Sequence, residues 1–263
     1  ISVGDYPVDH HHARYNGKVP PIPFPSVPSF NIPLGALMPE KIQGLVVCEK
    51  GISVSNIANG TTRLQPVVLL TGQAAGALAA VSLQQNINVQ DVSVTAVQKV
   101  LLTENVYLMP YSDVKHTDGA FKAVQWIGSW GIIKGIGKSV GWANKTYFKP
   151  DSLVTYSEIT AGLHALVPLD FSDKIKSNDP VTTVQLFEMI ARFNAAVAKN
   201  SKAARANKLS DGFLIADQTY INAGLAVPKL TKALTRKEAS FILHQFAKGL
   251  DYLDKDLSGA VFF

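Results

Sequence analysis

The stretch Thr61-Thr62-Arg63-Leu64-Gln65-Pro66, which leads into a long apolar segment, decides how the first part of the chain is interpreted. Pro66 fits a helix only in its first turn, where the missing N–H costs little. Thr62 with Gln65 three residues later is a capping-box pattern, which indicates the start of a helix. The sequence therefore predicts one long helix over residues 64–84 with a polar, capped N-terminus.

Small residues recur on one face of this predicted helix. Gly72, Gly76 and Ala80 are spaced by four residues and therefore share a face. Because glycine weakens a helix by about 1 kcal/mol relative to alanine, we expect the two glycines to allow close approach of another backbone, such as a sheet. The apolar residues 45–48 just upstream predict a buried strand. A strand followed by a polar loop and a helix N-terminus forms an edge where anionic ligands can bind.

Three segments follow the predicted strand in a fixed order: Ile52-Ser53-Val54-Ser55, Gly60-Thr61-Thr62-Arg63 and Gly72-Gln73-Ala74-Ala75-Gly76. Together with Pro66 they resemble the C-terminal end of the cofactor domain of FAD-dependent oxidoreductases. Residues 6–10 and 32–34 also resemble segments of that family. The chain departs from the family at Glu49-Lys50, where Gly-Arg usually follows the strand. A side chain at the glycine position is expected to crowd the cofactor, and its carboxylate to repel the cofactor phosphates.

The resemblance implies an α/β fold for residues 1–109, as the C-terminal portion of an incomplete, Rossmann-type FAD-binding domain. It also implies that the full-length protein transfers hydride between an organic substrate and FAD. In the family-like arrangement, the backbone N–H groups at the start of the long helix donate to a flavin carbonyl. The residues that the resemblance places at the cofactor are Lys50, Ser53, Ser55, Asn56, Arg63, Leu64 and Gln65.

The candidate catalytic residues are Asp9, His10 and Arg63. His10 occupies a family-matched position, and an Asp–His pair can fix the imidazole tautomer and tune its pKa; a histidine satisfied by loop contacts is the alternative. Arg63 stands where the helix begins, so its charge would add to the helix dipole. The alternative for Arg63 is a loop-bracing arginine bonded to backbone carbonyls. The consecutive histidines 10–12 have no Cys or Glu partner at zinc-like spacing, so no metal site is predicted.

A dinucleotide-binding fingerprint is missing from the sequence. FAD-dependent oxidoreductases of this type bind the adenine dinucleotide through a Gly-x-Gly-x-x-Gly turn after a first strand, and nothing in these 263 residues supplies it. The glycine-rich residues 131–137 end a predicted helix instead of opening one. The chain also begins without Met, and we interpret it as a piece of a longer protein. We therefore expect FAD in the full-length protein and no tight binding by this polypeptide alone.

The second half of the chain contains an internal repeat. Three segments each hold an apolar residue, a Thr, and a Glu or Gln three residues after the Thr. This pattern supplies both halves of a capping box, and each is followed by an apolar helical stripe. The three capping residues are Thr155, Thr182 and Thr235. We expect three helices that bury their faces against one another.

Residues 111–250 resemble S-layer homology modules. The resemblance rests on these caps and on four segments: Tyr111-Ser112-Asp113-Val114, a helix with Trp126 and Trp130, Gly131-Ile132-Ile133-Lys134-Gly135, and Phe148-Lys149-Pro150. Thr235-Arg236 keeps the Thr-Arg pair that such modules use, whereas Tyr156 and Thr183 replace the arginine in the other two copies. The resemblance implies a mainly α-helical repeat domain over residues 110–263, with a cell-surface polymer as its possible partner.

Composition narrows the class of protein. A chain of 263 residues with 47% hydrophobic and 17% charged residues is expected to be globular, with one or two domains. We find no apolar run long enough to span a bilayer. The net charge of +5 is spread along the chain, and the densest basic run, residues 199–208, is interpreted as a solvated helix end and not as a nucleic-acid site. The single Cys48 excludes an internal disulfide and is expected to be a buried thiol.

Three interpretations of function are open at this point. The first is a C-terminal fragment of an FAD-dependent oxidoreductase that acts on a small-molecule substrate and carries an accessory helical interaction domain. The second is a non-catalytic binding or structural module of the cell envelope, in which Glu49 marks lost cofactor binding. The third is an envelope carbohydrate-processing protein, although no pair of carboxylates in the repeats stands out as an acid/base set. We expect a bacterial protein with a periplasmic, cell-surface or secreted location.

Overall fold

The computed structural model describes residues 1–9, 24–167, 178–200, 217–247, 249–250 and 253. The chain divides into two compact units. Unit 1 comprises Ile1–Ser112 and Ile136–Tyr147, together with the C-terminal residues Lys255–Phe263, which lie outside the described part. Unit 2 comprises Asp113–Gly135 and Phe148–Asp254. Each unit is described by itself below.

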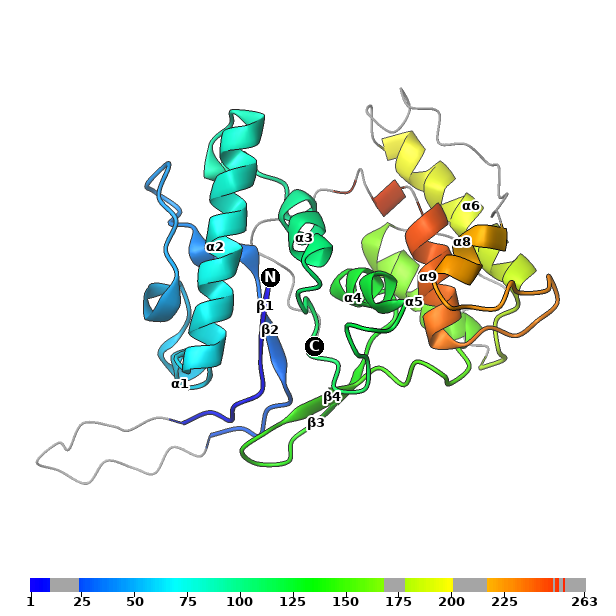
Figure 1. Cartoon of the computed structure of the whole chain (residues 1–263), viewed down its shortest axis with the longest axis horizontal. Helices are drawn as coiled ribbons and strands as arrows, with labels where there is room; N and C mark the ends of the chain where they lie inside the picture. The colour runs from blue at the N-terminus through cyan, green and yellow to red at the C-terminus, as the bar shows by residue number, and fades with distance from the viewer. Residues whose placement is uncertain (10–23, 168–177, 201–216, 248, 251–252, 254–263) are drawn as a thin grey trace, which may run out of the picture. The chain divides into compact units, whose positions relative to one another are not determined.

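Unit 1 is built around one long helix, α2 (Gln65–Gln85), with α3 (Val94–Thr103) and strand β1 (Ser2–Gly4) against it (Figure 1). Strand β1 pairs antiparallel with β2 (Phe30–Ile32), and β3 (Ile136–Lys138) pairs antiparallel with β4 (Lys145–Tyr147). The short helix α1 (Asn56–Thr62) precedes α2. The single-turn helices of the unit are η1 (Leu34–Leu37), η2 (Glu49–Gly51) and η3 (Val89–Asp91).

The prediction of a long helix over residues 64–84, with Pro66 in its first turn, is confirmed by α2. Pro66 lies in the first turn of α2, and the helix ends at Asn86, which adopts the left-handed conformation with φ 52°. Ala74 and Leu78 on its inner face are fully buried. Burial of such side chains, worth about 1.5–3 kcal/mol for each large one, is what holds a helix of this kind in place.

The capping-box prediction at Thr62 is wrong. Thr62 is the last residue of α1, and Leu64 is the N-cap of α2, without a side-chain cap hydrogen bond. The physical reason is that Ser55 starts a separate helix by accepting a hydrogen bond from the Ala58 N–H at 3.2 Å. Thr62 is therefore already helical and lacks the extended backbone that a capping residue needs.

The predicted strand at residues 45–48 is also wrong. These residues have no regular secondary structure, and Leu45 is 41% exposed. The segment is tied down by a hydrogen bond from the Val47 N–H to the Leu37 carbonyl at 2.7 Å. A strand needs neighbouring strands to pair its backbone groups, and the described residues of unit 1 place none beside it. Cys48 is consequently only partly buried, and not a core thiol as expected.

The glycine face of α2 is open, contrary to the predicted close approach of another backbone. A Cβ on Gly72 or Gly76 would meet no other atom of the described residues within 4 Å. Leu69 and Leu83 are 74% and 82% exposed. By length and composition α2 could cross a membrane, contrary to the expectation that no apolar run is long enough. This is weak evidence for a span, because the opposite face of α2 lies in the core of unit 1.

Unit 2 is helical. Its helices in chain order are α4 (Phe121–Ser129), α5 (Tyr156–Leu166), α6 (Thr183–Asn200), α8 (Asp217–Asn222) and α9 (Arg236–Phe246). Helix α9 packs against both α4 and α6. Trp126 and Trp130 are buried, with an edge-to-face contact of 6.2 Å between their ring centroids. Aromatic pairs of this geometry add to the energy of apolar burial.

Three short segments form a closed ring of backbone hydrogen bonds in unit 2. The Val154 N–H donates to the Leu234 carbonyl at 3.0 Å, and the Leu234 N–H donates to the Val181 carbonyl at 2.9 Å. The Val181 N–H completes the ring by donating to the Val154 carbonyl at 2.9 Å. These are the apolar residues that precede Thr155, Thr182 and Thr235. The repeated sequence pattern therefore corresponds to three equivalent positions that pair with one another.

The predicted threonine caps are present, with one difference. The Thr155, Thr182 and Thr235 hydroxyls accept from the backbone N–H three residues later. Gln185 and Glu238 reach back to the backbone N–H of Thr182 and Thr235, which completes those two capping boxes. In the first copy the Glu158 side chain instead pairs with Arg236, so the prediction of a full capping box there is wrong. An arginine partner competes successfully for the carboxylate because the hydrogen bond is charge-assisted.

Two helical glycines should respond in opposite ways to alanine. In Gly162→Ala the new Cβ would lie 2.2 Å from the Ile132 carbonyl oxygen, so we expect a loss of roughly 2 kcal/mol of unfolding free energy from overpacking. In Gly76→Ala the space is open, so we expect a gain of about 0.5–1 kcal/mol from helix propensity. Urea denaturation measures both, and equal effects of the two substitutions would contradict the described packing.

Candidate functional site

The N-terminus of α2 in unit 1 is the first candidate site. Leu64, the N-cap, is extended (φ −75°, ψ 147°) and gives no side-chain cap to the first turn. Gln65 is exposed, and Pro66 has no N–H. The first-turn N–H groups are thus left for water or a ligand, and the helix dipole favours an electron-rich group there. This geometry agrees with the predicted donor role of Leu64 and Gln65, which stays a prediction.

Ser53, Ser55 and Asn56 precede this site in the chain, and all three are exposed. The Ser53 N–H donates to the Ala36 carbonyl at 2.8 Å, which fixes the loop backbone. The Ser55 hydroxyl caps α1, and Asn56 is the first residue of that helix. Ser55 therefore stabilises the start of α1. The cofactor role predicted for the three residues stays a prediction.

Arg63 connects the start of α2 to the segment after β1. Its Nη2 donates to the Asp9 carbonyl at 3.2 Å and lies 3.5 Å from the Asp9 carboxylate. These are the contacts of a loop-bracing arginine, the alternative that the sequence left open. The Nε atom of Arg63 is buried and has no hydrogen-bond partner among the described residues. His10, the third candidate catalytic residue, lies outside the described residues.

Glu49 has a backbone conformation that glycine favours. Its φ is 61°, in the left-handed region, and its N–H donates to the Thr71 hydroxyl of α2 at 3.2 Å. A glycine would adopt this conformation without steric cost. The backbone at Glu49, the position where the family pattern has glycine, therefore adopts a conformation that glycine takes without steric cost. Lys50, the next residue, is exposed in η2.

The first 101 residues, which include the start of α2, are similar to a known protein family. Residues 1–101 match the family model described as FAD dependent oxidoreductase. The match supports an FAD-dependent oxidoreductase part in the first unit, and it spans every candidate catalytic and cofactor residue named above. Searches of curated proteins and of solved structures found no match.

The family match implies a Rossmann-like α/β domain and FAD binding in full-length relatives. The described residues of the matched part contribute a long helix and small antiparallel strands. Their donor set fits one side of a flavin: uncapped N–H groups at a helix start, with an arginine beside them. The carboxylate of Glu49 does not suit a phosphate, so the fit is to an electron-rich carbonyl and not to the dinucleotide phosphates.

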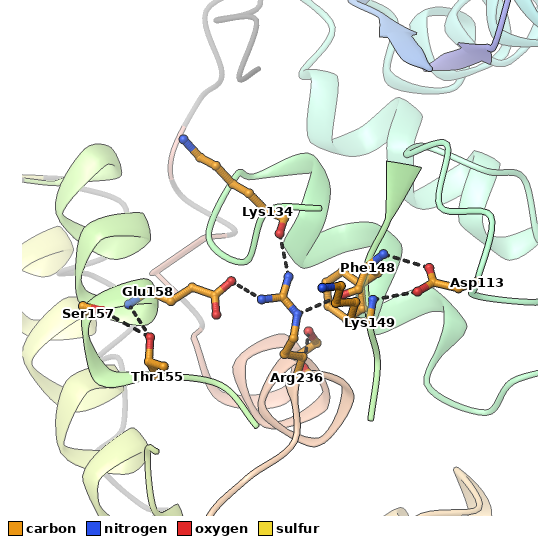
Figure 2. A network of polar contacts seen from close by, with 9 residues as sticks. Asp113, Lys134, Phe148, Lys149, Thr155, Ser157, Glu158 and Arg236 are labelled. Carbon is orange, nitrogen blue, oxygen red and sulfur yellow. Dashed lines mark hydrogen bonds and ion pairs between the residues drawn. The ribbon is translucent and has the colours of Figure 1, made fainter. Parts of the chain in front are cut away.

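A second polar network, around Arg236, lies in unit 2 (Figure 2). The Arg236 Nε donates to the Phe148 carbonyl at 2.6 Å, Nη2 donates to the Lys134 carbonyl at 2.5 Å, and Nη1 forms an ion pair with Glu158. The guanidinium also lies 4.8 Å from the centroid of the Phe148 ring. Arg236 is only 8% exposed. Through these four contacts the buried Arg236 side chain connects α9 to α5 and to the loops that contain Lys134 and Phe148; we call this cluster the Arg236 joint.

Asp113 fixes the other side of this joint. Its two carboxylate oxygens accept from the backbone N–H groups of Phe148 and Lys149, at 2.8 and 2.7 Å (Figure 2). Lys149 has a positive φ of 56°, so the turn is held in an uncommon conformation. The Thr235-Arg236 pair and the residues around Phe148 stand out as separate motifs in the sequence. That they contact one another across a long sequence separation follows only from the fold.

Glu238 is a buried carboxylate with several donors. Burial alone would raise the pKa of Glu238, but hydrogen bonds from Lys232 and Thr235 outweigh it and hold the pKa below the ordinary value. Glu238 also acts on Tyr220, whose pKa is raised mainly by burial and additionally by the nearby carboxylate. Both groups are therefore held in one protonation state near neutral pH, which suits a structural role.

Removing the Arg236 charge should destabilise unit 2. Arg236→Gln leaves Glu158 without its cation and two carbonyls without their donor, so we expect a loss of about 3 kcal/mol of unfolding free energy. Lys237→Gln is the matched control, since its partner Asp151 is 79% exposed and the loss should stay below about 0.5 kcal/mol. Urea denaturation of both variants would contradict a buried joint if the two losses were equal.

The ionised Glu238 side chain should stabilise the folded protein at neutral pH and lose this effect in acid. Because the pKa of Glu238 is lowered by folding, its contribution is present above the ordinary glutamate pKa and is lost as pH falls through the folded value. We therefore expect the melting temperature of Glu238→Gln to lie below that of the natural protein at pH 7. The difference should shrink below roughly pH 4. A difference independent of pH would contradict this assignment.

Proposed function

We propose that residues 1–109 form the C-terminal part of an FAD-dependent oxidoreductase domain, which transfers hydride between an organic substrate and FAD. The observation that carries the proposal is the uncapped N-terminus of α2, within the segment that matches the oxidoreductase family. A helix start with free N–H groups stabilises electron density on a nearby carbonyl. The flavin, when bound, supplies the hydride acceptor or donor.

The roles of this chain's residues follow from their positions. The N–H groups of Leu64 and Gln65 would bind a flavin carbonyl and so orient the ring. Arg63 holds Asp9 beside the start of α2, and His10 is the next residue in the sequence. We propose His10 as the proton-transferring group, with Asp9 and Arg63 setting the charge around it. Lys50, Ser53, Ser55 and Asn56 would line the same side of the site.

We further propose that the rest of the flavin site comes from polypeptide beyond these 263 residues. The open face of α2 supports this, because Leu69 and Leu83 are largely exposed and both glycines face free space. Small residues on one face of a long apolar helix suit close packing against a sheet. A further layer of the cofactor domain would bury this face.

Unit 2 is proposed as an accessory interaction module similar to S-layer homology repeats, with a cell-surface polymer as its partner. The closed ring of backbone hydrogen bonds and the three threonine caps support a threefold repeat. A cell-envelope location agrees with this module and is itself a proposal. Tyr156 and Thr183 in place of arginine would limit polymer binding to fewer sites than three identical copies would offer.

A non-catalytic envelope module is the second candidate function. Glu49 favours it, because a carboxylate stands where the family pattern has glycine, while the backbone keeps the left-handed conformation. In this alternative the oxidoreductase fold persists as a scaffold. The flavin spectrum distinguishes the two candidates.

The test uses the longer polypeptide that contains these residues, purified and examined by absorption spectroscopy. We expect a yellow protein with a flavin spectrum, and Gln65→Pro should lower FAD affinity roughly tenfold by removing one backbone donor. Proline is tolerated in the first helical turn, and Gln65→Ala, which keeps the N–H, is the matched control. A protein without flavin, even after incubation with FAD, would overturn the enzyme proposal and favour the envelope module.

A further inference from the structure

The β3–β4 hairpin belongs to unit 1, although it is inserted in the sequence within the repeats. One of its faces is fixed to the rest of the unit. The Thr146 and Ser29 hydroxyls are hydrogen-bonded at 2.7 Å, and a Cβ on Gly137 would lie only 2.6 Å from the Pro28 Cβ. Gly137 and Thr146 are directly paired across the strands, so they mark the packed face.

The opposite face of the hairpin is basic and partly apolar. Side chains alternate along a strand, so Ile136 and Lys138 of β3 share this face with Lys145 of β4. Lys138 and Lys145 are both exposed and are register partners. Like charges directly opposite each other destabilise a strand pair. Residues 136–147 contain no Asp or Glu, so nothing within the hairpin offsets this repulsion. An anionic ligand would do so.

The tip of the hairpin presents an exposed tryptophan on a braced loop. Trp142 is 72% exposed and Val140 is 47% exposed. The Asn144 side chain accepts from the Val140 N–H at 2.8 Å, and the Asn144 N–H donates to the Asp5 carbonyl at 2.8 Å. The ring of Trp142 contacts Tyr6, with 5.4 Å between centroids and planes inclined by 48°. The loop therefore holds a large aromatic side chain in solvent at a fixed place.

We propose that this hairpin, with Trp142 and Val140 at its tip and Lys138 and Lys145 on its free face, docks unit 1 onto an anionic lipid surface. Tryptophan prefers the membrane–water interface, and lysines beside it are attracted to acidic headgroups. The aliphatic side chains Ile136 and Val140 also gain from an apolar environment. The proposal is independent of the flavin site and of the repeats in unit 2.

A sugar polymer is the less suitable occupant of this surface. The Tyr6 and Trp142 rings are inclined by 48°, so they do not form one continuous aromatic platform for successive sugar rings. The Asn144 side chain is buried and uses its oxygen for the loop itself, so it does not offer this oxygen to a sugar. Exposed Ile136 and Val140 contribute little to a hydrated glycan. An acidic lipid surface offers negative headgroups for the lysines and an apolar layer for the exposed apolar side chains.

Vesicle binding tests the proposal with the full 263-residue chain. Vesicles of phosphatidylcholine with about 30% phosphatidylglycerol should bind the protein, because lysines near the surface are attracted to acidic headgroups. Trp126 and Trp130 are buried, so a blue shift of the fluorescence on binding reports Trp142. The double variant Lys138→Gln/Lys145→Gln should bind roughly 30-fold more weakly. Trp142→Ala should bind roughly tenfold more weakly and lose the blue shift.

The matched control replaces two exposed lysines of the same unit, Lys41→Gln/Lys99→Gln, which should bind as the natural protein does. Circular dichroism and thermal unfolding confirm that each variant is folded. Equal binding to pure phosphatidylcholine vesicles would overturn the proposal, as would an equal loss in the control variant. Retention on an immobilised acidic polysaccharide without vesicle binding would also overturn it and identify a glycan surface.

Discussion

Unit 2 depends on three backbone hydrogen bonds that close on themselves. The Val181 N–H donates to Val154, the Leu234 N–H donates to Val181, and the Val154 N–H donates to Leu234. None of the three segments can form this arrangement alone, because each supplies a donor and an acceptor to different partners. The closed ring places three threonine-capped helices in equivalent positions. It also brings Arg236 of the third copy to Glu158 of the first, where one ion pair replaces half of a capping box.

The three capped segments share their backbone pairing and their threonine caps but differ in the residues that follow. The position of Arg236 is occupied by Tyr156 and Thr183 in the other copies, and the position of Glu158 by Gln185 and Glu238. Only the joint between the first and third copies therefore has a buried arginine. At Glu238 the positive partner is Lys232, from the segment just before the helix. The carboxylate at this position is thus neutralised by Arg236 in the first copy and by Lys232 in the third. The copies differ in these residues, although all three take part in the ring of hydrogen bonds.

Unit 1 shows a different constraint, in which one long helix is buried on one side only. The inner residues of α2, such as Ala74 and Leu78, are in the core, while Gly72, Gly76 and the two exposed leucines face outward. Helix α2 lies within residues 1–101, which match the family model of FAD dependent oxidoreductases. The N-terminus of α2 is left without a side-chain cap, and Arg63 holds the Asp9 segment beside it. The uncapped helix start leaves backbone N–H groups that can bind a ligand, and Arg63 braces the neighbouring loop.

The sequence by itself determined the local signals. Pro66 located the start of α2, the threonine–glutamate spacing located the caps at Thr155 and Thr235, and the repeat was visible as a pattern. These succeed because propensity and capping depend on residues within one helical turn. Tertiary structure alone decided that residues 45–48 form no strand and that Glu158 pairs with Arg236. It also decided that residues 136–147, which lie in sequence between two segments of unit 2, belong to unit 1. Strand hydrogen bonds and ion pairs depend on partners that are distant in the sequence, and no local pattern specifies those partners.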